Sequence, residues 1–293
     1  MGTVVEASAI ATPGGDPSIA AVHLADAAAR ACAERAHRAP SDVQWLINAG
    51  VYLDRNISEP AIAALIQEDI DANLEPQTGG GQGTFSFDVR NGACGLLTGI
   101  ELIDGLLASG TIEVGMVVAA DADPEPGLTR GFGFPALGGA VMLGTDGALP
   151  GFTRFRSATF PEYAHLFSSA INWRAENGGG RNVLTVEIAE DYPARVLECA
   201  ETTTRELAAA DGLNLREVGA LYATASTPGF GRDLAERLGI PPALAASPPN
   251  GLGRAHTAGL AAALESLPLA DAGTALLVCA GAGITVAAAV YRG

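Results

Sequence analysis

The sequence predicts an α/β protein built from two similar halves, each rich in βαβ units. A weak internal repeat supports this prediction. A helix over about 18–37 and the apolar strand 44–48 are echoed by a helix over about 194–211 and the strand 219–223. The strands are uniformly apolar, which is typical of sheets that helices cover on both faces.

A second pair of elements supports the duplication. A helix and a glycine precede the apolar strand 114–120, and the same arrangement precedes the strand 274–279. A chain of 293 residues is long enough for a sizeable core. We therefore expect an N-terminal half at residues 1–150, which contains Cys94, and a C-terminal half at residues 151–293.

Composition and charge exclude some classes of partner. The net charge is −16, and all 17 basic residues are arginine. Such a surface repels nucleic acid and anionic membranes, so we expect neither as a partner. The apolar run 275–291 is interrupted by Gly281 and Gly283, which predicts strand, turn and strand rather than a membrane span.

The N-terminal sequence has no pattern of a targeting signal, so we expect a cytoplasmic protein. Abundant alanine, glycine and arginine without lysine indicate a GC-rich bacterial genome. The four cysteines have no metal-ligand spacing, so we expect no metal and no cofactor. Cys32, Cys199 and Cys279 lie in apolar stretches and are expected to be reduced core thiols.

Cys94 stands out among the cysteines because it lies at a turn between a β-type run and a helix expected over 100–109. A thiol at a helix N-terminus faces unpaired backbone N–H groups, which favour its thiolate. This arrangement predicts a nucleophile for thioester chemistry. The alternative is a small apolar side chain packed at a strand–helix junction.

The sequence around Cys94 resembles a known family. Residues 87–89, Gly95, Leu102, 106–107 and 109–110 match, without a gap, the pattern around the acyl-accepting cysteine of the β-ketoacyl-acyl-carrier-protein synthase III family in the thiolase superfamily. The resemblance implies a thiolase fold, in which two similar halves form five αβαβα layers. Its expected ligands are acyl-CoA or an acyl-carrier protein.

Two more stretches support the resemblance. Residues 134–143 are similar to the family's FGDGAGAAVL motif, and residues 280–285 are similar to its glycine-rich turn. In the family that turn lies at the catalytic site, which implies a role as an oxyanion turn for Gly281, Ala282 and Gly283. The resemblance therefore implies that the scaffold of the family is kept while its catalytic residues are not.

The family's catalytic Cys, His and Asn are missing on the simplest alignment. Their columns fall on Ala93, Thr224 and Arg254, while Cys94 lies one residue late. Threonine does not act as a base near neutral pH, and arginine is a permanent cation. Arg254 would bind a carboxylate or a phosphate, or block the site.

Three interpretations follow from the sequence. The first is a catalytically degenerate subunit that pairs with an active ketosynthase-III-like partner, or with itself as a dimer, in fatty-acid or polyketide-type metabolism. The second is an active acyltransferase in which Cys94 accepts the acyl group and His256 acts as its base. The third is a binding module for a hydrophobic ligand whose acid group is held by Arg254.

Overall fold

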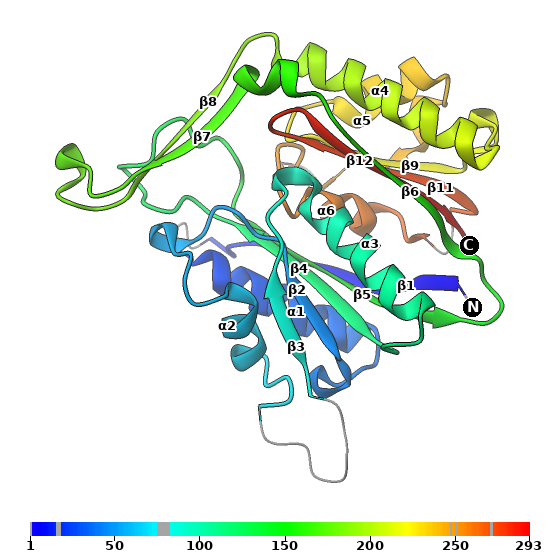
Figure 1. The fold of residues 1–293 in the computed structure, drawn as a ribbon, viewed down its shortest axis with the longest axis horizontal. Helices are drawn as coiled ribbons and strands as arrows, with labels where there is room; N and C mark the ends of the chain where they lie inside the picture. The colour runs from blue at the N-terminus through cyan, green and yellow to red at the C-terminus, as the bar shows by residue number, and fades with distance from the viewer. Residues whose placement is uncertain (1, 16–18, 75–82, 247, 250, 270–271) are drawn as a thin grey trace.

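Two five-stranded mixed sheets form the frame of the protein in a computed structural model (Figure 1). The structure describes residues 2–15, 19–74, 83–246, 248–249, 251–269 and 272–293. The first sheet has the order β1 (Gly2–Ala11), β5 (Leu137–Asp146), β4 (Gly115–Asp121), β2 (Trp45–Asn48) and β3 (Phe85–Asp88).

The second sheet repeats the order of the first. It consists of β6 (Gly151–Thr159), β12 (Thr285–Arg292), β11 (Thr274–Gly281), β9 (Ala220–Thr224) and β10 (Ala245–Ala246). In each sheet the first three strands pair antiparallel and the last three pair parallel. The predicted duplication is therefore confirmed at the level of strand order.

Helices complete the five layers. Their bounds are α1 (Ala21–Arg35), α2 (Ile62–Asp69), α3 (Gly95–Ala108), α4 (Tyr192–Asp211), α5 (Phe230–Leu238) and α6 (Gly259–Ser266). The pair α1 and α2 packs on the outer face of the first sheet, and α4 and α5 pack on the outer face of the second. Helices α3 and α6 lie between the sheets, which gives the αβαβα order expected from the resemblance.

Short 3-10 turns and a projecting hairpin make up the remaining regular structure. The turns are η1 (Pro40–Asp42), η2 (Asp54–Asn56), η3 (Gly92–Cys94), η4 (Pro161–Leu166), η5 (Glu176–Gly178), η6 (Leu215–Glu217) and η7 (Pro242–Leu244). Strands β7 (Phe167–Asn172) and β8 (Val183–Ile188) pair antiparallel and reach away from the two sheets (Figure 1). We call this hairpin, residues 167–188, the arm.

Small residues allow the central helices to approach the sheets closely. A Cβ atom added to Gly99 of α3 would lie 2.6 Å from Cγ1 of Val117 in β4. Ile100, Leu260 and Leu277 fill the same central core and are fully buried. Each fully buried side chain of this size contributes roughly 1.5–3 kcal/mol of transfer free energy, so the middle layer holds the two sheets together.

Carboxylates at strand ends and in turns cap the outer helices of the first half. Asp54 of η2 accepts hydrogen bonds from the N–H groups of Ala21 (2.9 Å) and Val22 (3.3 Å) at the start of α1. Asp88, the last residue of β3, accepts from the N–H groups of Ile62 and Ala63 at the start of α2. Neither helix has a side-chain N-cap of its own, so these distant carboxylates satisfy the free N–H groups.

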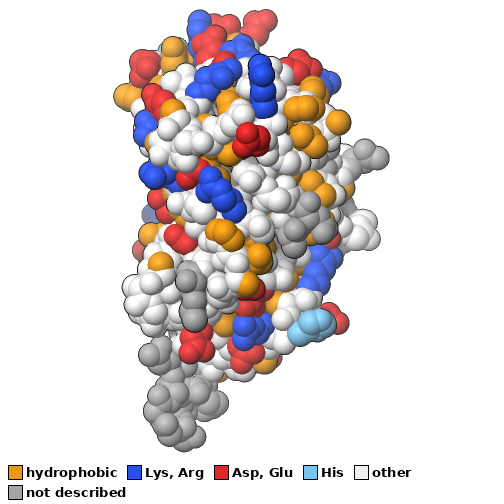
Figure 2. Space-filling model, turned by 90° about the vertical axis from the view of Figure 1, so that its right-hand side faces the viewer, with side chains coloured by type: hydrophobic (Ala, Val, Ile, Leu, Met, Phe, Trp, Pro, Cys, Tyr) orange, Lys and Arg blue, Asp and Glu red, His pale blue; other side chains and the backbone are white. Residues whose placement is uncertain are grey.

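The charged surface is mixed rather than divided by sign. On the face seen in Figure 2, basic and acidic side chains lie among one another. Around α4, Arg205 and Arg237 both pair with Glu201, and Arg292 and Arg154 both approach Asp211. Within the described residues no helix is long and apolar enough to cross a membrane.

Asp26 makes the stability of the N-terminal half sensitive to pH. Burial and the neighbouring Asp69 carboxylate raise the pKa of Asp26 to about 7, and Oδ1 has no hydrogen-bond partner among the described residues. The folded state therefore holds a proton that the unfolded state releases near pH 4, so this group's contribution to stability falls as pH rises from about 4 to 7. We expect Asp26→Asn to raise the urea midpoint at pH 8 and to leave it nearly unchanged at pH 4.

Glu34→Gln, on the exposed face of the same helix, is the control and should change neither midpoint. An Asp26→Asn variant with the same pH dependence as the wild type would contradict the assignment.

Candidate functional site

The start of α3 is the place where the sequence predicts a nucleophile, but the Cys94 side chain contacts backbone carbonyls of the second sheet. Its Sγ atom lies 3.2 Å from the carbonyl oxygen of Cys279 and 3.3 Å from that of Thr285. Complete burial raises the pKa of the Cys94 thiol well above its usual value. The expectation of a thiolate favoured by the helix is therefore wrong, because the thiol donates to carbonyls of β11 and β12 in an apolar layer.

Ala93 takes the position next to the glycine-rich turn. A Cβ atom added to Gly281, the last residue of β11, would lie 3.2 Å from the Ala93 nitrogen and 3.5 Å from its Cβ. Ala93 is buried, and the turn continues through Ala282 to Gly283, which has a φ of 78°. A methyl group therefore lies beside the turn where the resemblance places an acyl-accepting side chain.

Thr224, at the end of β9, lies close to this junction. Its hydroxyl is 3.6 Å from the Sγ atom of Cys279, which follows Val278 in the neighbouring strand β11. A Cβ atom added to Gly259, the first residue of α6, would lie 3.3 Å from Cβ of Thr224. Thr224 is thus a packed side chain between the second sheet and the central layer.

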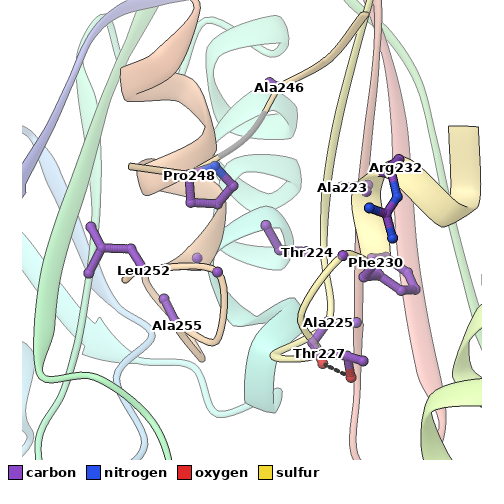
Figure 3. Close-up of a pocket in the computed structure, with 14 residues that line it drawn as sticks. Ala223, Thr224, Ala225, Thr227, Phe230, Arg232, Ala246, Pro248, Leu252 and Ala255 are labelled. Atoms are coloured by element: carbon purple, nitrogen blue, oxygen red, sulfur yellow. Dashed lines mark hydrogen bonds between the residues drawn. The ribbon is translucent and has the colours of Figure 1, made fainter. Parts of the chain in front are cut away.

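A cavity of about 250 Å³ opens beside Thr224. Figure 3 shows Thr224 between the loop that carries Leu252 and Ala255 and the start of α5, which carries Phe230. Among the described residues, the lining consists of Ala223, Thr224, Ala225, Thr227, Gly229, Phe230, Gly231, Arg232, Ala246, Pro248, Leu252, Gly253, Ala255 and Gly259. It is smaller than most pockets for drug-sized ligands and holds no carboxylate, cysteine or histidine.

Arg254 lies outside this cavity. Its neighbours Gly253 and Ala255 line the cavity, whereas the Arg254 side chain is exposed and its guanidinium lies 3.3 Å from the Cβ position of Gly133. The geometry therefore does not favour the expected contact between Arg254 and an acid group of a ligand held in this cavity.

His256 forms a buried pair with Asp121, the last residue of β4. The Nδ1 atom lies 3.5 Å from Oδ2 of Asp121, and both side chains are nearly inaccessible. The imidazole also contacts the rings of Tyr52 and Phe134, each with a centroid distance of 4.9 Å. Among the hydrogen bonds of the described residues, none joins His256 to Cys94, although Nε2 of His256 lies 3.9 Å from the Cβ position of Gly92 in the turn that ends at Cys94.

Asp121 connects the two halves through backbone hydrogen bonds. Oδ1 accepts from the N–H groups of Val51 (3.2 Å) and Tyr52 (2.8 Å), and Oδ2 accepts from the N–H (2.8 Å) and hydroxyl of Thr257. Burial alone would raise the pKa of Asp121, but the facing His256 ring, the Thr257 side chain and the Tyr52 N–H outweigh it and lower that pKa.

Sequence reasoning missed Asp121 and its aromatic neighbours. The available signal was an acidic residue directly after the apolar strand 114–120, where a charge at the end of a buried strand requires partners. Phe134 lies within a stretch already matched to the family, but the sequence gives no indication that its ring meets His256. Within the described part of the chain, no group of three or more His, Cys, Asp or Glu residues could hold a metal ion.

We expect Asp121→Asn to lower the free energy of unfolding by about 3 kcal/mol. Asparagine replaces one of the two accepting oxygens by an NH2 group, so that buried N–H donors lose their acceptor. The lowered pKa means that the carboxylate stabilises the fold above about pH 4 and loses this effect as the pH falls further. The difference in the free energy of unfolding between wild type and Asp121→Asn, measured by urea unfolding, should therefore be smaller at pH 3.5 than at pH 7.

Asp123→Asn is the matched control for this measurement. Among the described residues, the Asp123 side chain accepts only the local N–H of Glu125, and an asparagine oxygen can keep that bond. A change below about 0.5 kcal/mol is expected for this variant. Equal losses in both variants would contradict a connecting role for Asp121.

No family model matches the chain, and no curated protein sequence is similar to it. The structure superimposes on 3-oxoacyl-[acyl-carrier-protein] synthase III from Aquifex aeolicus VF5 with a TM-score of 0.81 and 17% identity, covering 100% of both chains.

Two further solved structures are similar over nearly their full length. One is OleA from Xanthomonas campestris with bound lauric acid and lauroyl-CoA (TM-score 0.79, 14% identity, 100% of this chain and 99% of that chain). The other is the priming β-ketosynthase of the R1128 polyketide pathway (TM-score 0.80, 17% identity, 99% and 96% coverage). The two repeated sheets, the five layers and these superpositions together show that the chain has the thiolase fold of the synthase III and OleA structures.

Proposed function

We propose that this protein is a non-condensing thiolase-fold subunit that supports an active ketosynthase-III-like partner in acyl-thioester metabolism. The observation that carries the proposal is the absence of a usable nucleophile at the described start of α3. Ala93 offers only a methyl group beside Gly281, and the Cys94 thiol is buried against backbone carbonyls with a raised pKa. Covalent acyl transfer requires an accessible thiolate or hydroxyl with a base, and this junction provides neither.

The second half does not replace the lost groups. Thr224 lines the cavity but cannot accept a proton near neutral pH, and Arg254 lies outside the cavity. His256 could serve as a base by its chemistry, yet its ring is enclosed by Tyr52 and Phe134 and does not line the cavity. Decarboxylation would need donors placed at the developing oxyanion, and no such donor set is formed by these side chains.

The preserved scaffold is the reason to expect a partner. A chain with both repeated sheets and a full central layer can still offer the surfaces that a thiolase-fold subunit uses for pairing. Homologous subunits commonly pair through like surfaces, and a hetero-pair imitates this arrangement. The related OleA structure contains lauroyl-CoA, which points to acyl thioesters as the substrate class of the partner.

Strand β3 is the surface we assign to pairing. It is an edge strand of the first sheet, and Phe85 is 56% exposed beside the rings of Trp45 and Phe87. An edge strand has unpaired backbone groups that can bind a strand of another chain, and the exposed aromatic ring adds apolar area. The same edge would serve a second copy of this chain if the protein pairs with itself.

The first test is acyl loading followed by intact-protein mass. We expect incubation with a panel of acyl-CoA donors, lauroyl-CoA among them, to leave the native mass unchanged. Cys94→Ala and Cys279→Ala serve as a matched pair, since both thiols are buried at the same junction. An adduct lost only in Cys94→Ala would contradict the proposal and establish the acyltransferase alternative.

The second test is pairing with a ketosynthase-III-like protein of the same organism that has Cys, His and Asn. We expect the two chains to co-purify, and the partner's condensing activity to rise at least tenfold when this chain is added. Phe85→Asp should abolish co-purification, because a desolvated carboxylate at an interface is costly.

Thr202→Asp is the control for the pairing test, since Thr202 is exposed on α4 in the outer layer of the other half. This variant should co-purify like the wild type. A partner that is equally active without this chain, or pairing that survives Phe85→Asp, would count against the proposal.

A further inference from the structure

Residues near the turn of the arm contact η2, and a cleft lies between them. The Asn56 side-chain amide donates to the Asn182 carbonyl oxygen (2.9 Å), and the Asn182 side chain accepts from the Arg174 N–H (3.2 Å). Two adjoining cavities of about 610 and 660 Å³ lie here and share Arg55 and Asn182. Their volumes fall within the range of small-molecule sites.

The first cavity is strongly basic for a chain with a net charge of −16. Three arginines, Arg55, Arg174 and Arg181, line it together with a single carboxylate, Glu125. Glu125 pairs with Arg181 at 3.2 Å, while among the described residues neither Arg55 nor Arg174 has an ion pair or a side-chain hydrogen bond. Two unpaired guanidinium groups at one cavity repel each other, and an anion between them would remove that repulsion.

Backbone contacts hold the two unpaired arginines at the cleft. Arg55 and Arg174 have φ angles of 52° and 50°, in the left-handed region that residues other than glycine seldom adopt. The Arg55 N–H donates to the Pro124 carbonyl oxygen (2.9 Å), and the Arg174 N–H is held by Asn182. Such conformations persist only where surrounding contacts over-determine them, and they concentrate at ligand clamps.

The second cavity has an aromatic wall and acceptor groups. Trp173 lines it and is 65% exposed, although most tryptophan side chains are largely buried. Glu59 also lines this cavity, and its carboxylate can accept hydrogen bonds from an exocyclic amino group. Asp54 lines it too, but its oxygens already accept from the start of α1.

From this arrangement we propose that the cleft between η2 and the arm binds a nucleotide that carries at least two phosphates. The phosphates contact Arg55, Arg174 and Arg181, and the base lies against Trp173 near Glu59. The same chemistry is supplied by a free nucleoside diphosphate or by the nucleotide part of coenzyme A. This cleft is separate from the cavity beside Thr224, since the two share no lining residue.

ADP is the probe for the test, with binding measured by calorimetry and by tryptophan fluorescence. We expect ADP to bind at least tenfold more tightly than adenosine, with an affinity that falls as the salt concentration rises. Arg55→Gln and Arg174→Gln should each weaken binding about tenfold, because each removes a charge-assisted contact. The ADP-dependent fluorescence change should disappear in Trp173→Phe, since the other tryptophan, Trp45, lies in β2.

Arg195→Gln is the control, because Arg195 is an exposed arginine of α4 that lines neither cavity. Thermal unfolding of each variant checks that the substitutions leave the fold intact. ADP that fails to bind the wild type, or that binds equally well to the two arginine variants, overturns the proposal. Coenzyme A that competes with ADP identifies the cofactor's nucleotide part as the source, and absence of competition identifies a free nucleotide.

Discussion

The buried Asp121 carboxylate is the interaction on which the arrangement of the two halves depends. It lies at the end of a strand in the first sheet and binds backbone N–H groups of the first-half loop and of the segment that opens α6. A charge at this depth is tolerable because backbone N–H groups and the Thr257 hydroxyl donate to both of its oxygens. The position of His256 follows from the same carboxylate, and so does the enclosure of the imidazole by Tyr52 and Phe134. The connection between the halves thus also fixes the one histidine of the candidate site.

The strand–helix junction keeps the close packing of the fold, while its one thiol is buried against backbone carbonyls. Gly281 still allows the chain to approach residue 93 closely, and α3 still begins beside the second sheet. The Cys94 thiol, however, contacts carbonyls of β11 and β12 and does not have the exposure that the sequence predicted for a nucleophile. A cavity remains at the end of β9, but its lining has no titratable group with a pKa near neutrality. The proposed function follows from this combination, because a fold can serve binding and pairing independently of any one site.

The sequence predicted the architecture well and the site only in part. Repeated helix–strand units and uniformly apolar strands were sufficient for the duplicated, layered fold, because strand burial leaves a pattern in every residue. The start of α3 was predicted at residue 100, whereas the helix begins at Gly95, since glycines in the first turn hide its propensity. The orientation of Cys94 could not be predicted, because a shift of one residue at a turn reverses a side chain. His256 and Asp121 lie 135 residues apart in sequence, and no local sequence pattern predicts a contact over such a separation.

The burial of the thiols also determines how the protein responds to oxidants. All four cysteines are free and buried, and burial raises the pKa of each, to about 12 for Cys32 and Cys279 and about 11 for Cys199. Peroxides and disulfides react with thiolates, and none of these thiols presents one to solvent. The same packing that buries Cys94 against β11 and β12 therefore also shields Cys279 from oxidants in solution.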